Sequence, residues 1–569
     1  MPTTIIITVL LLFAIISIII FSEHKKSVSI KKNIYEKIQE EWNSISAPEN
    51  DNGNIENLKE NYKYFDKSNE YEIDDITWND MEMDGVFIKL NYTKSFMGEA
   101  YLYNMLRNPT DKIASLKERE RISDLFYNNK ELRERKLYQL IKIGKNNRLY
   151  FEEYKNIIKD LKLYKKSKHI IYPVIFFLTL LIIPFNIIIG ISLSLLSLFF
   201  DIYSYYQDKA KIENYIPMMV QLGSMLNSVK GLNEKTNFDD IDKYTRRLND
   251  SIHLTKKYNR YIAKIRTMIN GNHTEFDVAV DYIRIITHMD LIAFINLKNY
   301  INENMVLIQR CYQIVGYIDS MISIAIFKRQ YHLKYEGRLF MSRPELAADE
   351  KGHLRVIDGF NPLLEKPVVN SFDIRRPALV TGSNATGKST FLRTVGINAI
   401  LAQTVFVVCA REYSSSLFKI YSSMNIKDDI FRSSSYYMTE IRSIKRILDA
   451  SDNNLTILCC LDEVLRGTNT IERIGAASEI LESLAQKNVL SIVSTHDIEL
   501  SYILENYYEN YHFQEKITQN DIVFDYCLYQ GRSYSRNAIH LLKILGYSDD
   551  IISNSIKKVN TYIDTGRWS

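Results

Sequence analysis

The chain has 569 residues, of which 46% are hydrophobic and 25% charged, and this balance excludes a wholly disordered, collagen-like or disulfide-framework protein. Lys and Arg number 72 against 68 Asp and Glu, so the net charge of +4 gives no global field for binding nucleic acid. The five cysteines are scattered and odd in number, which is typical of a reduced, cytosolic protein: Cys311, Cys409, Cys459, Cys460 and Cys527.

The chain begins with an apolar segment. Residues 5–21 form an uncharged run of 17 residues, just long enough to cross a bilayer. Neither a basic region before it nor a small-residue cleavage site after it is present, so the run predicts an uncleaved anchor; a buried core helix is the alternative. Lysines follow the run and favour a cytoplasmic location for what comes next. We expect a transmembrane anchor over 1–21 and, because residues 40–77 are acidic and weakly periodic, a cytosolic linker over 22–77.

A second apolar run covers residues 170–200. As one helix these 31 residues would be ~46 Å long at ~1.5 Å per residue, which exceeds a hydrocarbon core of ~30 Å. Pro184, Phe185 and Asn186 interrupt the run near its middle. The sequence therefore predicts a hairpin that dips into or through the membrane. The alternative is a single tilted membrane helix, which would place residues 22–169 on the opposite side from the C-terminal half.

Helical periodicity surrounds this run and gives way to an α/β pattern after Pro344. No proline occurs between Pro217 and Pro344, and apolar residues recur there at helical spacing. Short β-rich runs then alternate with helical patterns, which indicates an α/β domain over 345–569. Basic residues gather within 201–280 and would suit DNA phosphates, anionic lipid headgroups or a solvated helix face: Lys230, Lys243, Arg246, Arg247, Lys256, Lys257, Arg260, Lys264 and Arg266.

The segment GSNATGKS fits the phosphate-loop pattern G-x-x-x-x-G-K-[ST]. A short apolar strand precedes it and a helical pattern follows it, as a phosphate loop requires. Backbone N–H groups of such a loop surround phosphate oxygens, Lys388 reaches the β- and γ-phosphates of ATP, and Ser389 holds Mg²⁺. The predicted nucleotide-binding residues are Gly382, Ser383, Asn384, Ala385, Thr386, Gly387, Lys388, Ser389 and Thr390.

Two further apolar strands end in polar residues. The run 454–461 leads into Asp462 and Glu463, and we expect Asp462 to serve the Mg²⁺ shell and Glu463 to accept a proton from the attacking water. The run 488–493 leads to His496, which would sense the γ-phosphate. A surface acidic pair and a structural histidine are the alternatives.

These motifs resemble those of the MutS ATPases of DNA mismatch repair and their paralogues. TGSNATGKSTFLRTVGINAILAQT (381–404), LDEVLRGTNT (461–470) and STHDIEL (494–500) are similar to the family's nucleotide motifs. DDIFRSSSYYMTEI (428–441) is similar to its signature and places Ser435 at the signature serine. SFMGEAYLYNMLRNP (95–109) and residues 319–325 are similar to its core and lever segments.

The resemblance implies a fold of mixed α and α/β class. Beside the membrane anchor, which the apolar run predicts, it comprises a long-helix core/lever region and a C-terminal ABC-type P-loop NTPase domain. The helical core would cover 78–169, and lever helices with a reduced clamp would cover 201–344. The ATPase domain, over 345–569, would include C-terminal dimerisation helices. A homodimer is implied, with Ser435 completing the ATP site in trans, and double-stranded, mismatched DNA is the implied partner.

The sequence also departs from the family pattern. Ser433-Ser434 replace the usual Gly-Arg of the signature, and Ser383 and Ala385-Thr386 replace the usual Pro and Met-Gly of the loop. We expect no mismatch-recognition domain and no nuclease-like extension. The tripeptide Phe151–Glu153 matches a mismatch-reading F-x-E only by coincidence, because it sits in a charged helical stretch.

Two classes of function follow. The first is an integral cell-membrane ATPase with core and ATPase domains in the cytoplasm and a DNA mismatch-repair role. The second is a membrane mechanoenzyme or scaffold that uses the same ATP cycle on lipid or a membrane protein without DNA. An ABC transporter is disfavoured, since the apolar segments supply at most three crossings and no LSGGQ signature occurs.

Overall fold

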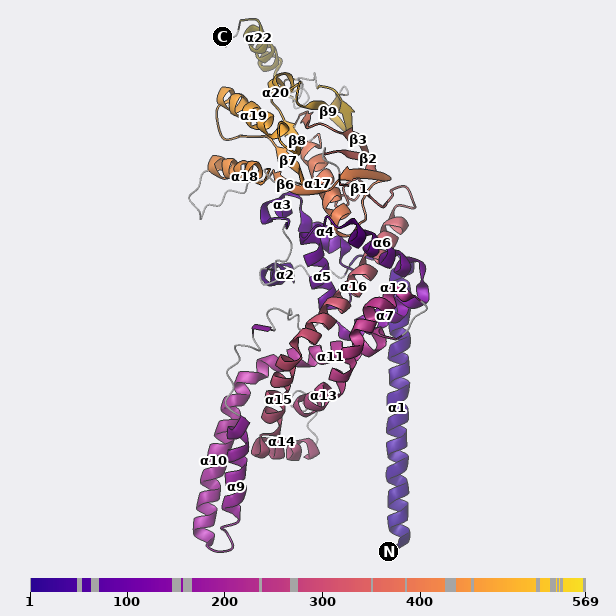
Figure 1. Cartoon of the computed structure of the whole chain (residues 1–569), viewed down its shortest axis with the longest axis vertical. Coiled ribbons are helices and arrows are strands. Elements are labelled where there is room, and N and C mark those ends of the chain that lie inside the picture. Colours follow the sequence, from indigo (N-terminus) through magenta and orange to yellow (C-terminus); the bar gives the residue numbers. More distant parts are fainter. Residues whose placement is uncertain are drawn as a thin grey trace. The chain divides into compact units, whose positions relative to one another are not determined.

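The computed structural model of the chain contains two compact units (Figure 1). Unit 1 comprises Met1–Lys67, Leu90–Asn104 and Arg121–Leu333, and unit 2 comprises Ser68–Lys89, Met105–Glu120 and Lys334–Ser569. The structure describes residues 2–48, 54–62, 71–145, 155–156, 166–234, 238–266, 275–348, 352–383, 386–424, 436–451, 455–517, 522–532, 539, 542 and 546–565.

Unit 1 is helical over its described residues, as the periodicity predicts. Its long helix α16 is buried along most of its second half, where apolar and small residues alternate without proline. Helices α5 and α6 contribute residues to both units. The helices are α1 (Pro2–Asn43), α2 (Asn54–Tyr62), α5 (Phe96–Arg107), α6 (Ile113–Asn128), α7 (Lys130–Ile143), α9 (Lys166–Leu180), α10 (Ile187–Ile212), η1 (Glu213–Tyr215), α11 (Ile216–Leu232), α12 (Asp239–Thr245), η2 (Arg246–Leu248), α13 (Asn249–Arg266), α14 (Glu275–Thr287), α15 (Met289–Glu303) and α16 (Met305–Lys334).

The start of α5 and the middle of α16 meet in unit 1. Buried Asp319 accepts hydrogen bonds from the backbone N–H of Ser95 (2.8 Å) and from its hydroxyl (2.6 Å). A Cβ placed on Gly98 would lie 2.3 Å from Asp319 Oδ2, so only glycine permits this approach. The two upstream segments that resemble the MutS core and lever are therefore in direct contact.

The apolar segment 170–200 folds as two helices. Helix α9 ends at Leu180, residues 181–186 form the turn, and α10 runs back alongside α9 (Figure 1). The segment is therefore folded as a helical hairpin and not as one continuous helix. Among the described residues, one continuous helical stretch, Ile187–Leu232, is long and apolar enough to cross a membrane on length and composition alone.

Unit 2 is an α/β domain built on two sheets. The larger sheet has the order β10-β9-β4-β8-β7-β6, parallel except for the β10–β9 pair, and the smaller has the order β1-β5-β2-β3. The strands are β1 (Glu345–Ala347), β2 (Leu354–Gly359), β3 (Asn370–Ile374), β4 (Ala378–Thr381), β5 (Glu412–Ser416), β6 (Phe418–Ser423), β7 (Thr456–Asp462), β8 (Val489–Thr495), β9 (Glu509–Ile517) and β10 (Ile522–Gln530). The helices are α3 (Asp75–Asp80), α4 (Met83–Leu90), α17 (Lys388–Thr404), α18 (Tyr436–Ala450), α19 (Thr470–Ala485), α20 (Ile498–Ile503) and α22 (Asp549–Thr565).

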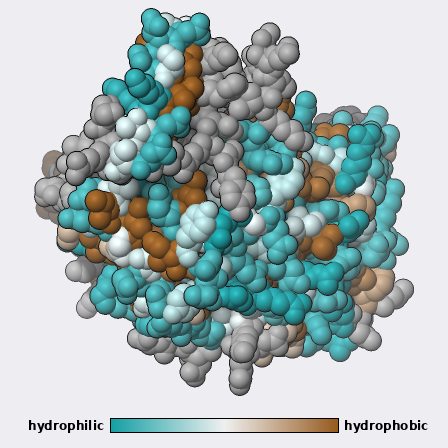
Figure 2. All heavy atoms as spheres, turned by 90° about the horizontal axis from the view of Figure 1, so that it is seen from above, coloured by the Kyte–Doolittle hydropathy of each residue, from teal (hydrophilic) through white to brown (hydrophobic). Residues whose placement is uncertain are grey.

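Strands β4, β7 and β8 are wholly buried, because helices cover the sheet. Helix α17 packs on β6, β7 and β8, while α19 also packs on β8. The continuous apolar composition of these strands follows from burial on both faces. In the view from above, hydrophilic residues predominate on the described surface, and hydrophobic residues gather in several patches among them (Figure 2).

Two predicted segments are divided differently in the structure. Residues 22–43, expected in a linker, form the second half of α1. The expected helical core 78–169 is split, since residues 78–89 and 105–120 belong to unit 2. The reason is contact with the sheet and with α17. The Asp80 carboxylate accepts a hydrogen bond from Ser422 Oγ of β6 at 2.7 Å, and the Asp80 backbone carbonyl accepts one from Arg393 Nε of α17 at 2.9 Å.

Candidate functional site

The candidate site lies where three parallel strands end. Strands β4, β8 and β7 are neighbours, and their register pairs Thr381 with Thr495 and Asp462 with Ser494. Because carboxyl ends of parallel strands share one edge of a sheet, the phosphate loop after β4 meets the residues after β7 and β8. The topology thus assembles three segments that are far apart in the sequence.

Lys388 begins α17 and points back into the phosphate loop. Its Nζ donates hydrogen bonds to the carbonyls of Gly382 (2.8 Å) and Ser383 (2.9 Å). Burial disfavours the charged form and lowers the pKa of Lys388 to about 8, although Glu463 and Asp462 oppose this shift. Gly387, just before it, has a φ of 104°, a conformation that L side chains rarely adopt.

Ser389 and Asp462 form the oxygen-rich part of the site. The Ser389 hydroxyl donates to Asp462 Oδ2 at 2.7 Å, and Ser494 Oγ donates to the other carboxylate oxygen. Asp462 is buried at the end of β7, so its orientation is set by these two hydroxyls. A hydroxyl and a carboxylate are the hard oxygen donors that Mg²⁺ prefers, so these two residues fit the ion.

Glu463 lies between a histidine and an arginine. His496 Nε2 is 2.8 Å from Glu463 Oε1, and Arg466 Nε is 2.8 Å from Oε2. Burial alone would raise the pKa of Glu463, but the His496 hydrogen bond and the Arg466, His496 and Lys388 charges outweigh it, so the pKa lies below the ordinary value. Glu463 is therefore ionised at neutral pH, the form that a general base requires.

The structure adds residues that motif matching did not single out. Arg466 also lies 3.5 Å from Asp462 Oδ2, and Glu440 of α18 accepts a hydrogen bond from the Leu465 N–H at 2.5 Å. Tyr526, on β10, lies beside Gly387: a Cβ on that glycine would be 3.3 Å from its ring. Arg466 follows the acidic pair inside a quoted motif, whereas nothing in the sequence connects Tyr526 with the loop.

Two of the other predicted nucleotide-binding residues lie in the loop and in the helix that follows it. Thr386 closes the loop by donating from Oγ1 to the Ser383 carbonyl at 2.8 Å, and Thr390 lies in the first turn of α17. Asn384, Ala385 and Ser435 lie outside the described residues.

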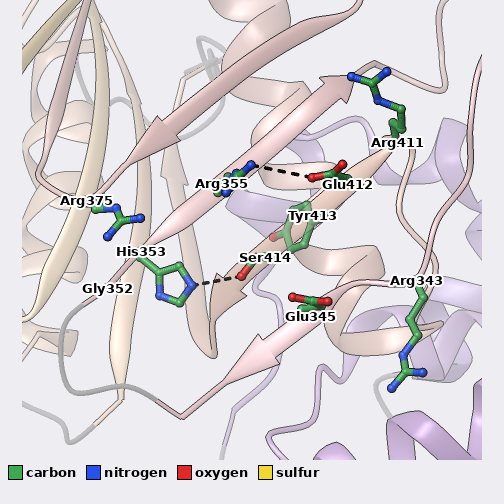
Figure 3. A pocket seen from close by; sticks show the side chains of 10 residues that line it. All are labelled: Arg343, Glu345, Gly352, His353, Arg355, Arg375, Arg411, Glu412, Tyr413 and Ser414. Carbon is green, nitrogen blue, oxygen red and sulfur yellow. Dashed lines mark hydrogen bonds and ion pairs between the residues drawn. The ribbon is translucent and has the colours of Figure 1, made fainter.

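A cavity of about 800 Å³ lies elsewhere in unit 2, beside strands β1, β2 and β5 of the small sheet (Figure 3). Four arginines line it, but each lies near a carboxylate: Arg343 near Glu120 (3.4 Å), Arg355 near Glu412 (3.8 Å), Arg375 near Asp373 (3.1 Å) and Arg411 near Asp358 (3.2 Å). The cavity contains no residue of the phosphate loop. Its positive charge is compensated, so it does not compete with the β4–β7–β8 edge as the site of chemistry.

The fold and the site geometry define unit 2 as a phosphate-loop nucleotide-binding domain. Residues 378–562 match the family model of MutS domain V, so this part of unit 2 is similar to that domain.

Curated relatives give the same result at low identity. The chain is 28% identical over 287 residues to the DNA mismatch repair protein MutS of Petrotoga mobilis, a match that covers 48% of this chain and 32% of that protein. It is 27% identical over 283 residues to MutS of Fervidobacterium nodosum, covering 47% and 34%. For MutS of Clostridium novyi the identity is 26% over 283 residues, covering 47% and 30%. The chain therefore matches about a third of the length of these relatives.

Proposed function

We propose that this chain binds and hydrolyses ATP at the carboxyl-end edge of β4, β7 and β8. The observation that carries the proposal is the Ser389–Asp462 hydrogen bond of 2.7 Å beside the Glu463–His496 contact of 2.8 Å. A metal-holding pair and an ionised candidate base thus converge next to a phosphate loop. The likeness to MutS domain V supports the proposal.

Each residue has a defined role in this mechanism. Bound phosphates replace the Gly382 and Ser383 carbonyls as partners of Lys388, whose ammonium then stabilises the charge that develops on the transferred phosphoryl group. Ser389 and Asp462 would hold Mg²⁺, which supplies positive charge against the phosphate oxygens when bound. Glu463 orients the attacking water and takes its proton. His496 holds the Glu463 carboxylate in place and lies 3.4 Å from Lys388 Nζ, close enough to sense the γ-phosphate.

The active form in this proposal is a dimer. The MutS resemblance supports a homodimer in which Ser435 of one protomer reaches the γ-phosphate bound by its partner. Ser435→Ala should then lower turnover in the dimer and leave an enforced monomer unaffected. An equal loss in both forms would refute the trans arrangement.

DNA is proposed as the partner because the curated relatives are named DNA mismatch repair proteins. Helix α13 supplies a matching surface, since its exposed face carries Lys256, Lys257, Arg260 and Lys264 while Leu254, Tyr258 and Ile262 on the other side are buried. Phosphate contacts of this kind weaken as salt rises.

Membrane anchoring is the second part of the proposal. The apolar helical start of α1 would form the anchor, with both units in the cytoplasm at the cell membrane. The many exposed apolar residues of α9 and α10 favour this location. The alternative function, a membrane mechanoenzyme or scaffold without DNA, uses the same site and anchor.

The test is ATP hydrolysis by the full-length protein in detergent, with no DNA, homoduplex or mismatched duplex, at low and moderate salt. Hydrolysis that DNA alters, with an effect that fades as salt rises, supports the DNA role. In that case Lys256→Ala with Arg260→Ala should remove the DNA effect and leave the basal rate unchanged. A hydrolysis rate that DNA does not change favours the membrane alternative. If ATP is not hydrolysed with or without DNA, the ATPase proposal is overturned.

A further inference from the structure

The α9–α10 hairpin is apolar on almost every outward side. No Asp, Glu, Lys or Arg occurs between Lys168 and Asp201. On α10 the exposed apolar residues point in all directions except toward α9: Ile187, Ile188, Ile189, Ile191, Leu193, Leu195, Leu196, Phe199 and Phe200. A protein partner that covered one face would leave the rest in water, whereas lipid chains cover the whole circumference.

Several polar and small residues of the hairpin lie between its two helices. Gly190 packs against the backbone of Ile183, where a Cβ would lie 2.7 Å from it. Thr179 Oγ1 and Ser197 Oγ are 3.1 Å apart and hydrogen-bonded between the helices. These two hydroxyls therefore satisfy each other at the helix–helix contact, as polar side chains between membrane helices do.

The backbone N–H groups of the turn are also satisfied internally. The N–H groups of Leu181, Ile182, Ile183, Phe185 and Asn186 each donate to a carbonyl three or four residues earlier, and Pro184 has no N–H to satisfy. The Asn186 side chain caps α10 by accepting from the Ile189 N–H at 3.1 Å. Phe185, 90% exposed, forms the tip. A loop in water needs none of this, whereas a loop in hydrocarbon requires it.

The base of the hairpin has the composition of a membrane interface. Tyr203 and Tyr206 are exposed within two turns beyond Phe200. Behind them lie charged groups: Lys168 and Lys211 both contact Asp208, at 3.1 and 2.9 Å. The hydrocarbon boundary therefore falls close to Phe200.

The length between boundary and tip decides the topology. From the tip residue Phe185 to Phe200 the chain has 16 residues, or ~24 Å at ~1.5 Å per residue. The hydrocarbon core is ~30 Å thick, so the tip stops ~6 Å short of the far side. We infer that α9–α10 is a re-entrant hairpin whose tip ends within the lipid acyl chains and never reaches the opposite aqueous phase. The inference rests on the membrane anchoring proposed above and specifies which lipid region this surface contacts.

The experiment places a tryptophan at each end of the hairpin. Phe185→Trp and, as the matched control, Tyr203→Trp are introduced into the full chain and reconstituted in phosphatidylcholine/phosphatidylglycerol vesicles. Lipids that carry a quencher either near the headgroup or deep in the acyl chain are compared, and the parent protein is subtracted for its native tryptophans. Because α1 alone would keep the protein on the vesicles, local quenching is measured and not flotation.

The inference predicts that the added fluorescence of Phe185→Trp, at the tip, is quenched at least twofold more by the deep label than by the shallow one. The order should be reversed for Tyr203→Trp, at the base. Iodide, outside or trapped inside, should leave the tip fluorophore unquenched. Quenching of the tip by iodide from the compartment opposite the ATPase domain means that the hairpin crosses, and this overturns the inference. Absence of lipid quenching at the tip overturns it as well. ATP hydrolysis in the same vesicles separates either result from a failure of the ATPase proposal.

Discussion

His496 Nε2 lies 2.8 Å from Glu463 Oε1, although the two residues are separated by a helix and a strand in the chain. They meet because β7 and β8 are adjacent and parallel, and each residue directly follows the last residue of its strand. The contact presents an ionised carboxylate to the phosphate loop.

Replacing Glu463 by glutamine should remove turnover and preserve ATP binding. The amide cannot accept a proton, and a positioned base typically contributes 10²–10⁴-fold, so the rate should fall at least ~100-fold. Phosphate release and equilibrium nucleotide binding measure the two quantities. Glu505→Gln, which changes a carboxylate paired with Arg532 at 2.7 Å, is the matched control and should leave both turnover and ATP binding unchanged. Unchanged hydrolysis in Glu463→Gln would remove this residue from the mechanism.

ATP affinity should fall above pH 8. The pKa of Lys388 is lowered to about 8, so the ammonium that binds phosphate is fully present well below that value and is lost as pH rises through it. Bound phosphates raise the pKa of Lys388 again, so the protein takes up a proton when ATP binds at high pH. Calorimetric titrations from pH 7 to 9.5 should show an affinity that is flat at first and then declines by up to ~10-fold per pH unit.

The control for this pH dependence is Lys388→Arg, whose guanidinium remains charged throughout the range. The ATP affinity of this variant should be lower at every pH, because the planar guanidinium group does not fit the position of the Lys388 ammonium. That affinity should not decline further above pH 8. A decline of equal slope in both proteins would assign the effect to another group.

Gly98→Ala should destabilise unit 1. The added Cβ would lie 2.3 Å from Asp319 Oδ2 and 2.5 Å from its Cγ, and Asp319 is fixed by hydrogen bonds to Ser95. Overpacking of this kind costs about 1–3 kcal/mol. Gly475→Ala on α19 is the control, since a Cβ there meets nothing within 4 Å and helix propensity favours alanine. Thermal unfolding should shift down for the first variant only; equal midpoints would contradict the close contact.

The buried pair of His288 and Asp201 should also matter for stability. His288 Nε2 is 3.3 Å from Asp201 Oδ1, and both side chains are fully buried. Burial lowers the pKa of His288 to about 4 and raises that of Asp201 to about 7, so the imidazole is neutral at pH 7 and the contact is not an ion pair. His288→Asn keeps a residue that tolerates the local φ of 51° but removes the ring, which also lies 3.2 Å from the Asp201 carbonyl and 3.0 Å from His169, at a cost of about 1–3 kcal/mol. Asp201→Asn keeps the shape of the side chain and should cost less. Adding Asp201→Asn to His288→Asn should recover part of the loss, and a purely additive loss measured by denaturant unfolding would refute the pairing.

The candidate nucleotide site was predictable from sequence because its parts are local. A phosphate loop needs eight consecutive residues, and a buried parallel strand is a continuous apolar run that is easily located, as at 454–461 and 488–493. Where such strands end, Asp462, Glu463 and His496 follow, so their convergence with Lys388 and Ser389 was predictable from the general rule that parallel strands end at one edge. The structure brings these residues together at hydrogen-bonding distances.

Contacts between distant segments were decided only by the tertiary structure. Tyr526 reaches Gly387 through the pairing of β10 with β9 and of β9 with β4, and no local pattern encodes that order. Residues 78–89 join unit 2 because Asp80 finds hydrogen-bonding partners on the sheet, whereas helical periodicity alone assigns them to the helical core. Periodicity shows which side of a helix is buried but not which element covers it. The sequence therefore determined which residues stand at the strand ends, whereas packing decided to which unit each helix belongs.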